Sequence, residues 1–204
     1  MSPDYSIAAI PTVYRGRAYR SRLEARWAAF FDRLGLVAEY EPFDLGVWSP
    51  DFLLTEIKTL VEIKPITEFD AKTWKKMLAA CKRRRLLSGE NQINALFLSM
   101  VAPVHSEEGI VQLGWVAMPW HDQAAKALPA YVAWMKHASK PLFIADIAAM
   151  TAGGFCTTDT EIAWSADNLS ELVDTMPTAY CDYTMEQWAA ATSDVQWLPD
   201  ESSP

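Results

Sequence analysis

The 204-residue chain contains few cysteines, few histidines and no apolar run of membrane-spanning length. Its three cysteines are widely spaced and form no Cys-x-x-Cys pair, so we expect reduced thiols rather than a disulfide framework or a structural zinc site. The three histidines lack a His-Glu-x-x-His pattern. The N-terminal residues do not show the charged start and apolar stretch of a secretion signal. These absences predict a soluble cytoplasmic protein with no membrane partner.

Hydrophobic residues make up 50% of the chain, and nine residues are tryptophan. This composition predicts a folded globule, because disordered chains are poor in aromatic residues. The length suits one substantial core with some elaboration. We expect the core over residues 1–120 and an acidic extension or subdomain, packed on that core, over residues 121–204.

The net charge of -8 argues at first against a nucleic-acid partner, because phosphate binding depends largely on Lys and Arg. The charge is unevenly distributed. Residues 1–100 carry 15 of the 18 basic and 12 of the 26 acidic residues, a balance of +3, whereas the remaining residues carry -11. A basic half joined to an acidic half is compatible with phosphate binding on one face of the molecule.

The first hundred residues alternate between helical and extended patterns. Apolar residues recur at helical spacing in two segments, and Gly35 ends the first of them. Short segments rich in aromatic and β-branched residues predict three consecutive antiparallel strands, and a later apolar run predicts a strand covered on both faces. In chain order we expect a helix over Ser21–Leu34, strands within residues 38–45, 47–54 and 59–66, a helix over Phe69–Leu87 and a strand over residues 94–100.

The patterns weaken further along the chain. Residues 114–120 suggest one more strand, and residues 124–138 and 182–193 suggest helices, whereas the segments 144–154 and 161–176 are ambiguous. We therefore expect an α/β protein, with a mixed central sheet flanked by helices and a mainly helical C-terminal elaboration.

Three charged residues stand in the apolar strand segments. Alternate residues of a strand share a face, so Glu62 and Lys64 should project together, and a tight strand pairing would bring Asp51 beside Glu62. Two convergent carboxylates with an open side suit Mg²⁺ or Mn²⁺, with the backbone carbonyl of Ile63 as a further ligand. Lys64 would then orient a metal-activated water or neutralise the charge of a phosphodiester transition state. An exposed strand with a solvated ion pair is the structural alternative.

Glu24 lies in the first turn of the first predicted helix and fits two roles. It could bring a third carboxylate to the metal, directly or through water. Ser21 and Glu24 also have the spacing of a capping box, in which the glutamate only stabilises the start of the helix. Spacing alone leaves both interpretations open.

These residues resemble the PD-(D/E)XK nuclease superfamily, whose members include restriction endonucleases, resolvases and phage nucleases. Glu24 in the leading helix, Pro50-Asp51 and Glu62-Ile63-Lys64 match its motif. The segment YRGRAYRSRLEARWAAFFDRLGL, followed by YEPFDL and PDFLL, is moreover similar to small nucleases of bacteriophages and prophages, and the resemblance covers about residues 14–100. It implies a restriction-endonuclease-like α-β-β-β-α-β core and favours Glu24 as a site residue.

The resemblance implies a Mg²⁺-dependent endodeoxyribonuclease that hydrolyses DNA phosphodiester bonds with a metal-activated water, in the bacterial host cytoplasm if the chain is phage-encoded. Its catalytic residues would be Glu24, Asp51, Glu62 and Lys64. The second helix lacks the glutamine of some exonuclease-like branches, and residues after 120 match no known pattern. RNA as a substrate stays open. A homodimer would suit cleavage of both strands.

Basic residues cluster near the first helix and along the second. Such clusters are commonly solvated helix faces, but their closeness to the predicted metal site favours phosphate contacts by Arg17, Arg20, Lys72 and Lys75. Trp48, beside the Asp51 strand, is a candidate for stacking on an unpaired base. The charge asymmetry also supports an alternative, in which a nuclease fold serves as a binding or regulatory module in a phage or host-defence complex and the acidic half binds a basic protein.

Overall fold

The computed structural model of the chain describes residues 9–55, 59–65, 69–88, 94–98, 104–105, 111–117, 128–134, 141–144 and 178–195. Within these ranges the helices are α1 (Arg22–Arg33), α2 (Ala71–Ser88) and α5 (Thr178–Asp194). The strands are β1 (Thr12–Tyr14), β2 (Arg17–Tyr19), β3 (Ala38–Tyr40), β4 (Phe52–Leu54), β5 (Thr59–Ile63), β6 (Asn94–Leu98), β7 (Val104–His105), β8 (Val111–Ala117), β9 (Leu128–Trp134) and β10 (Pro141–Ile144).

One mixed sheet organises the described residues. Its strands lie in the order β10-β9-β8-β6-β5-β4-β3, and β7 pairs with β8. Strands β5 and β6 run parallel, and the other pairs in this sheet are antiparallel. A parallel pair needs a crossover connection, which α2 supplies between β5 and β6. The observed order α1-β3-β4-β5-α2-β6 confirms the sequence of elements that the apolar patterns predict.

Helix α1 begins and ends where the sequence indicates. The Ser21 side chain caps its first turn by accepting a hydrogen bond from the backbone N–H of Glu24. At its other end Gly35 adopts a φ of 71°, which glycine tolerates without steric cost, and Leu36 donates its N–H to the carbonyl of Phe31. The helix is therefore fixed at both ends by its own local sequence.

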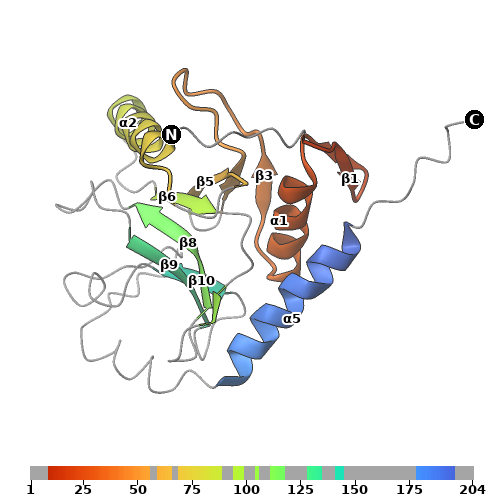
Figure 1. Cartoon of the computed structure of the whole chain (residues 1–204). Helices are drawn as coiled ribbons and strands as arrows, with labels where there is room; N and C mark the ends of the chain where they lie inside the picture. Colours follow the sequence, from red (N-terminus) through yellow and green to blue (C-terminus); the bar gives the residue numbers. More distant parts are fainter. Residues whose placement is uncertain are drawn as a thin grey trace, which may run out of the picture.

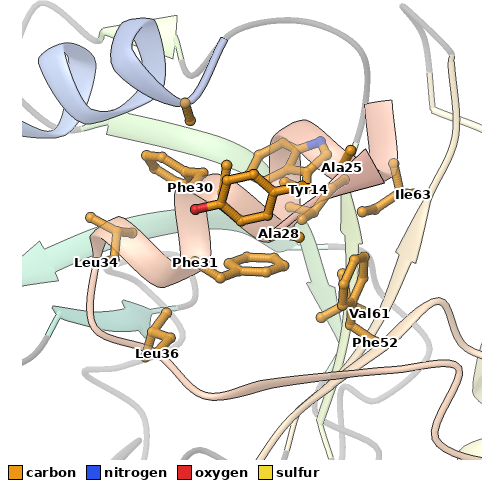
Figure 2. Packing of buried hydrophobic residues seen from close by; sticks show 14 of the residues in the cluster. Tyr14, Ala25, Ala28, Phe30, Phe31, Leu34, Leu36, Phe52, Val61 and Ile63 are labelled. Carbon is orange, nitrogen blue, oxygen red and sulfur yellow. The ribbon is translucent and has the colours of Figure 1, made fainter. Parts of the chain in front are cut away.

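Two hydrophobic clusters cover the two faces of the sheet, because side chains alternate along each strand. Val61 and Ile63 of β5 face α1, whereas Leu60 faces α2. Phe31 of α1 packs against Phe52 of the sheet, whereas Phe30 packs against Trp188 of the helix α5 (Thr178–Asp194) (Figure 2). The predicted arrangement of a mixed sheet flanked by helices is thus present in the described part of the chain.

Helix α5 returns from the C-terminal part of the chain to lie along α1 (Figure 1). Trp188 packs against Trp27 in a tilted arrangement with ring centroids 4.6 Å apart. Arg33 of α1 forms an ion pair with Asp194 at 2.8 Å, so a polar contact closes the far end of this interface. The helix expected over residues 182–193 is confirmed, and it starts four residues earlier.

Two expectations about local structure are corrected or extended. Residues 124–138 were expected to be helical, but β9 occupies 128–134 and pairs with both β8 and β10. Pairing with neighbouring strands overrides the helical spacing of its alanines, which is a weak preference. A hairpin of β1 and β2, which the residue patterns did not predict, precedes α1; Arg15 and Gly16 form its turn with φ angles of 46° and 77°.

Residues 145–177, which include most of the ambiguous segments, lie outside the described residues, as does Cys156. Cys81 carries a buried thiol on α2. Among the helices that the structure describes, none has the length and apolarity to cross a membrane.

Candidate active site

The pairing of β4 with β5 brings Asp51 and Glu62 together. Phe52, the first residue of β4, lies opposite Val61 in this antiparallel pair, and Asp51 directly precedes it. The backbone N–H of Asp51 donates to the carbonyl of Val61 at 2.9 Å, a bond offset by one residue from the register of the two strands, so Asp51 is held at the end of β5. Both carboxylates are buried, with 2% and 4% of their residue surfaces exposed. The charge of Glu62 acts on the Asp51 carboxylate strongly enough to raise its pKa, so the two acids lie near each other.

Two protein groups hold the Asp51 carboxylate. Its Oδ2 accepts a hydrogen bond from the N–H of Ile63 at 2.7 Å, and its Oδ1 lies 2.5 Å from Nη2 of Arg20. Burial, and next the negative charge of Glu62, raise the pKa of Asp51 to about 7, although the Ile63 N–H and the Lys64 ammonium act in the opposite direction. Asp51 therefore exchanges its proton near neutral pH.

The pKa of Asp51 predicts a pH-dependent stability. An acid whose pKa rises from 3.8 to about 7 on folding favours the folded state most below about pH 4, and this contribution is lost as the pH rises through 7. In EDTA, thermal denaturation should show that the stability of the wild-type protein falls as the pH rises from about 4 to above 7. The stability of the Asp51→Asn variant should fall less over the same range. Added Mg²⁺ should restore more stability at about pH 8 than at about pH 6, because protons then compete less for the carboxylate. Identical pH profiles of the two proteins would contradict the raised pKa.

Glu62 is bound by one cation and one neutral donor. Its Oε1 lies 2.6 Å from Nζ of Lys64, which confirms that the two side chains project together. Its Oε2 accepts a hydrogen bond from the indole N–H of Trp48 at 2.7 Å. Burial would lower the pKa of Lys64, but the charge and hydrogen bond of Glu62 outweigh it and raise the pKa. Lys64 therefore stays protonated, and its side chain remains 41% exposed.

Trp48 supports the Glu62 carboxylate and does not present its ring for base stacking. It is buried in the cluster around α2, so its ring has no open face for a base. Its indole instead orients the Glu62 carboxylate, a contact that no sequence pattern indicates because Trp48 lies in an irregular segment before β4. The stacking interpretation is wrong for this residue.

If Glu62 holds a metal ion, replacing Trp48 with phenylalanine should weaken metal binding and any cleavage about 10–100-fold, as losing an outer hydrogen bond to a metal-ligating side chain commonly does. The matched control is Trp74→Phe. Trp74 lies in the same buried cluster, but within the described part of the chain its indole nitrogen has no hydrogen-bond partner. Calorimetric titration with Mn²⁺ measures both variants. Equal losses in the two would show that aromatic volume matters and the hydrogen bond to Glu62 does not.

Only the Ser21 half of the predicted capping box is observed, because the Glu24 side chain does not bond to the Ser21 backbone N–H in the described structure. Ser21 caps the helix as expected, but the Glu24 carboxylate accepts hydrogen bonds from the N–H of Arg20 at 3.2 Å and the hydroxyl of Tyr40 at 2.5 Å. Burial and the hydrogen bond to Glu24 raise the pKa of Tyr40 to about 12, so the hydroxyl remains a donor. Tyr40, which sequence reasoning missed, thus connects Glu24 to β3 beside the Asp51 strand.

The basic residues divide into engaged and exposed groups. Arg20 contacts the carboxylates of the site, whereas Arg17, Lys72 and Lys75 stand exposed on β2 and α2. Arg26 lies over the ring of Trp188, 5.7 Å from its centroid, and burial and the charge of Arg22 lower its pKa. The basic cluster around α1 is therefore not a single phosphate-binding face.

The donor chemistry at Asp51 and Glu62 fits a hard cation. Mg²⁺ takes one or two carboxylates and completes its shell with water and substrate oxygens. Within the described ranges no group of three or more His, Cys, Asp or Glu side chains is close enough together to hold a metal ion. Glu24 reaches the pair through Arg20, whose guanidinium lies between Glu24 and Asp51.

Comparisons with family models, with curated proteins and with solved structures found no match to this chain. The functional assignment therefore depends on the site itself.

Proposed function

We propose that this chain is a divalent-metal-dependent nuclease of the PD-(D/E)XK type, which hydrolyses phosphodiester bonds in DNA. One observation carries the proposal: two buried carboxylates, Asp51 and Glu62, meet at the end of a strand pair, and a protonated lysine, Lys64, lies on the second of them. The element order α1-β3-β4-β5-α2-β6 supports it, because that order suits a restriction-endonuclease-like core.

In this proposal the side chains have separate roles. Asp51 and Glu62, with the backbone carbonyl of Ile63, would hold Mg²⁺ or Mn²⁺, and Glu24 would act through water. The ion, when bound, supplies acidity for a water molecule and positive charge for the phosphodiester. Lys64 is protonated, so it stabilises the negative charge that develops on the phosphate oxygens rather than taking a proton from water.

The direct test is incubation of purified protein with supercoiled, linear, single-stranded and branched DNA, with Mg²⁺ or with EDTA. We expect cleavage of at least one substrate in Mg²⁺ and none in EDTA. Cleavage that is indifferent to EDTA would contradict the proposal. A parallel RNA substrate distinguishes a deoxyribonuclease from a nuclease that accepts both nucleic acids.

A second function, a nuclease fold that binds without cleaving, is favoured by a specific feature of the site. Asp51, Glu24 and Glu62 are each already bonded to donors of this chain, and the described residues present no cluster of three metal ligands. Calorimetry separates the two functions. Binding of Mg²⁺ or Mn²⁺ favours the nuclease, whereas a stable complex with a basic protein and no metal binding favours the regulatory module.

The exposed lysines of α2 give a prediction about DNA binding. Replacing Lys72 and Lys75 with alanine should weaken DNA affinity similarly for all sequences, because phosphate contacts carry no sequence information. The slope of log affinity against log salt should fall by about one for each lysine that contacts a phosphate. Fluorescence anisotropy over a salt series measures the slope. Arg33→Gln is the control, because Arg33 is held by Asp194 at the α5 interface; a similar loss in this variant would indicate a general charge effect.

A further inference from the structure

Arg20 lies among three carboxylates: Glu24 of α1, Glu41 directly after β3 and Asp51 directly before β4. Its Nη2 is 2.5 Å from Asp51, and its Nε is 3.0 Å from Glu41 and 3.8 Å from Glu24. The side chain is nevertheless 58% exposed, so it reaches the site from the solvent side. The cation that balances these acids in the described structure is therefore a guanidinium of the chain itself.

The backbone conformation of Glu41 places this residue beside both Asp51 and Arg20. Its φ of 47° lies in the left-handed region, which residues other than glycine adopt uncommonly. In this conformation its N–H donates to the carbonyl of Asp51 at 2.8 Å, while its half-exposed carboxylate binds Arg20. Unusual backbone conformations of this kind concentrate at functional sites. Glu41 thus contacts the backbone of Asp51 through its N–H and the Arg20 guanidinium through its carboxylate.

A divalent ion and Arg20 cannot both use Asp51 without conflict. The guanidinium occupies Oδ1 of Asp51, and the N–H of Ile63 occupies Oδ2. A second cation on the same carboxylate would be repelled by the first, because screening is weak around buried charges. The two nitrogens of Arg20 have different partners, however, so the contact with Asp51 can break while the contact with Glu41 remains.

We propose that Arg20 is the counter-cation of the metal-free site, and that Glu41 keeps this guanidinium beside the site when a divalent ion replaces it on Asp51. The inference rests on the proposed metal-dependent function and adds a positioning residue, Glu41, to it. Once Arg20 leaves Asp51, its Nη groups are available to a phosphate oxygen of the substrate, and a planar guanidinium binds such oxygens in pairs.

A purely structural role for Arg20 predicts a different result. If Arg20 only oriented Asp51 for the metal, its removal would lower metal affinity. If the metal ion instead replaces Arg20 on Asp51, removal of Arg20 should raise the metal affinity. A cation within about 4–6 Å changes the affinity of a carboxylate for another cation by about tenfold or more, so removing Arg20 should raise Mn²⁺ affinity by about that factor at about pH 8, where protons compete less for Asp51.

The experiment is calorimetric titration of Mn²⁺ into EDTA-stripped wild-type protein, Arg20→Gln and Arg20→Lys, with thermal denaturation to verify folding. We expect tighter binding in R20Q and an intermediate affinity in R20K, which keeps the charge but loses the two-sided contact. Cleavage by R20Q should fall despite its tighter metal binding.

Glu41→Gln tests the other half of the inference. Without its outer partner, Arg20 should remain on Asp51 more firmly, so Mn²⁺ should bind more weakly than to wild type. In the R20Q background the same change should have little effect, because no guanidinium remains to be held. Glu39→Gln, which removes an exposed carboxylate of β3 nearby, controls for the loss of one negative charge.

The outcomes separate the two proposals. Unchanged or weaker Mn²⁺ binding in R20Q, with wild-type protein still binding metal and cutting DNA, would overturn the exchange and leave the nuclease proposal standing. Additive effects of R20Q and E41Q would overturn the role of Glu41. Binding to R20Q but not to wild type would support Arg20 as the resident cation and overturn metal-dependent cleavage by the native chain. Absence of Mn²⁺ binding to every variant would overturn both.

Discussion

Replacing Lys64 with alanine should reduce Mg²⁺-dependent DNA cleavage about 10²–10³-fold, the usual effect of removing one group that stabilises transition-state charge. Lys64 is suited to this role because its contact with Glu62 raises its pKa and keeps it cationic. Metal affinity should be unchanged or higher, because a positive charge leaves the neighbourhood of the carboxylates. Single-turnover cleavage assays and Mn²⁺ calorimetry on the same preparation measure the two effects.

Removing Lys64 also leaves the buried Glu62 carboxylate without its cation, which by itself destabilises the fold. Lys64→Gln keeps a hydrogen-bond donor near Glu62 and separates the two consequences. It should fold at least as well as the alanine variant and still lose cleavage. Lys82→Ala, an exposed lysine of α2, is the control for charge. Full cleavage by a folded K64Q protein would remove Lys64 from the mechanism.

Replacing Trp27 with alanine should lower the free energy of unfolding by about 3–5 kcal/mol, the usual loss for a fully buried large aromatic side chain. Trp27 has no exposed surface and packs against Phe30 and Phe31 of its own helix and Trp188 of α5. Its indole nitrogen has no hydrogen-bond partner among the residues that the structure describes, so we attribute the expected loss to packing. Urea denaturation followed by circular dichroism measures it.

Two further variants serve as controls for the stability loss expected of Trp27→Ala. Val13→Ala, on the exposed hairpin, should change stability by less than about 0.5 kcal/mol. Trp188→Ala should also be destabilising, and the double variant should lose less than the sum, because the two rings contact each other. A loss below about 1 kcal/mol for Trp27→Ala, or strict additivity, would contradict the packing of α5 on α1.

The helix α1 and the residues of its two ends could be predicted because their signals are local. A cap at Ser21, a stop at Gly35 and apolar residues at helical spacing act within a few turns of chain. The convergence of Glu62 with Lys64 was likewise predictable, because side chains two residues apart on a strand share a face. The strand over residues 128–134 could not be predicted, because it depends on pairing with strands that its own sequence does not specify.

The contacts that orient the site also lay beyond sequence reasoning. Tyr40, Glu41 and Trp48 contact Glu24, Arg20 and Glu62 through side chains whose spacing follows no helical or strand period. Their positions depend on how the chain between β3 and β4 folds over the sheet.

By itself, the sequence determined the order of helices and strands in the first hundred residues and the presence of two acids and a lysine on neighbouring strands. These follow from periodicity and from the geometry of extended backbone. Only the tertiary structure decided that Asp51 and Glu62 are both buried, that Arg20 is the cation between Asp51 and Glu24, and that α5 completes the core beside α1. Such facts depend on which segments meet in space, and burial and charge neutralisation act between residues that are distant in the chain.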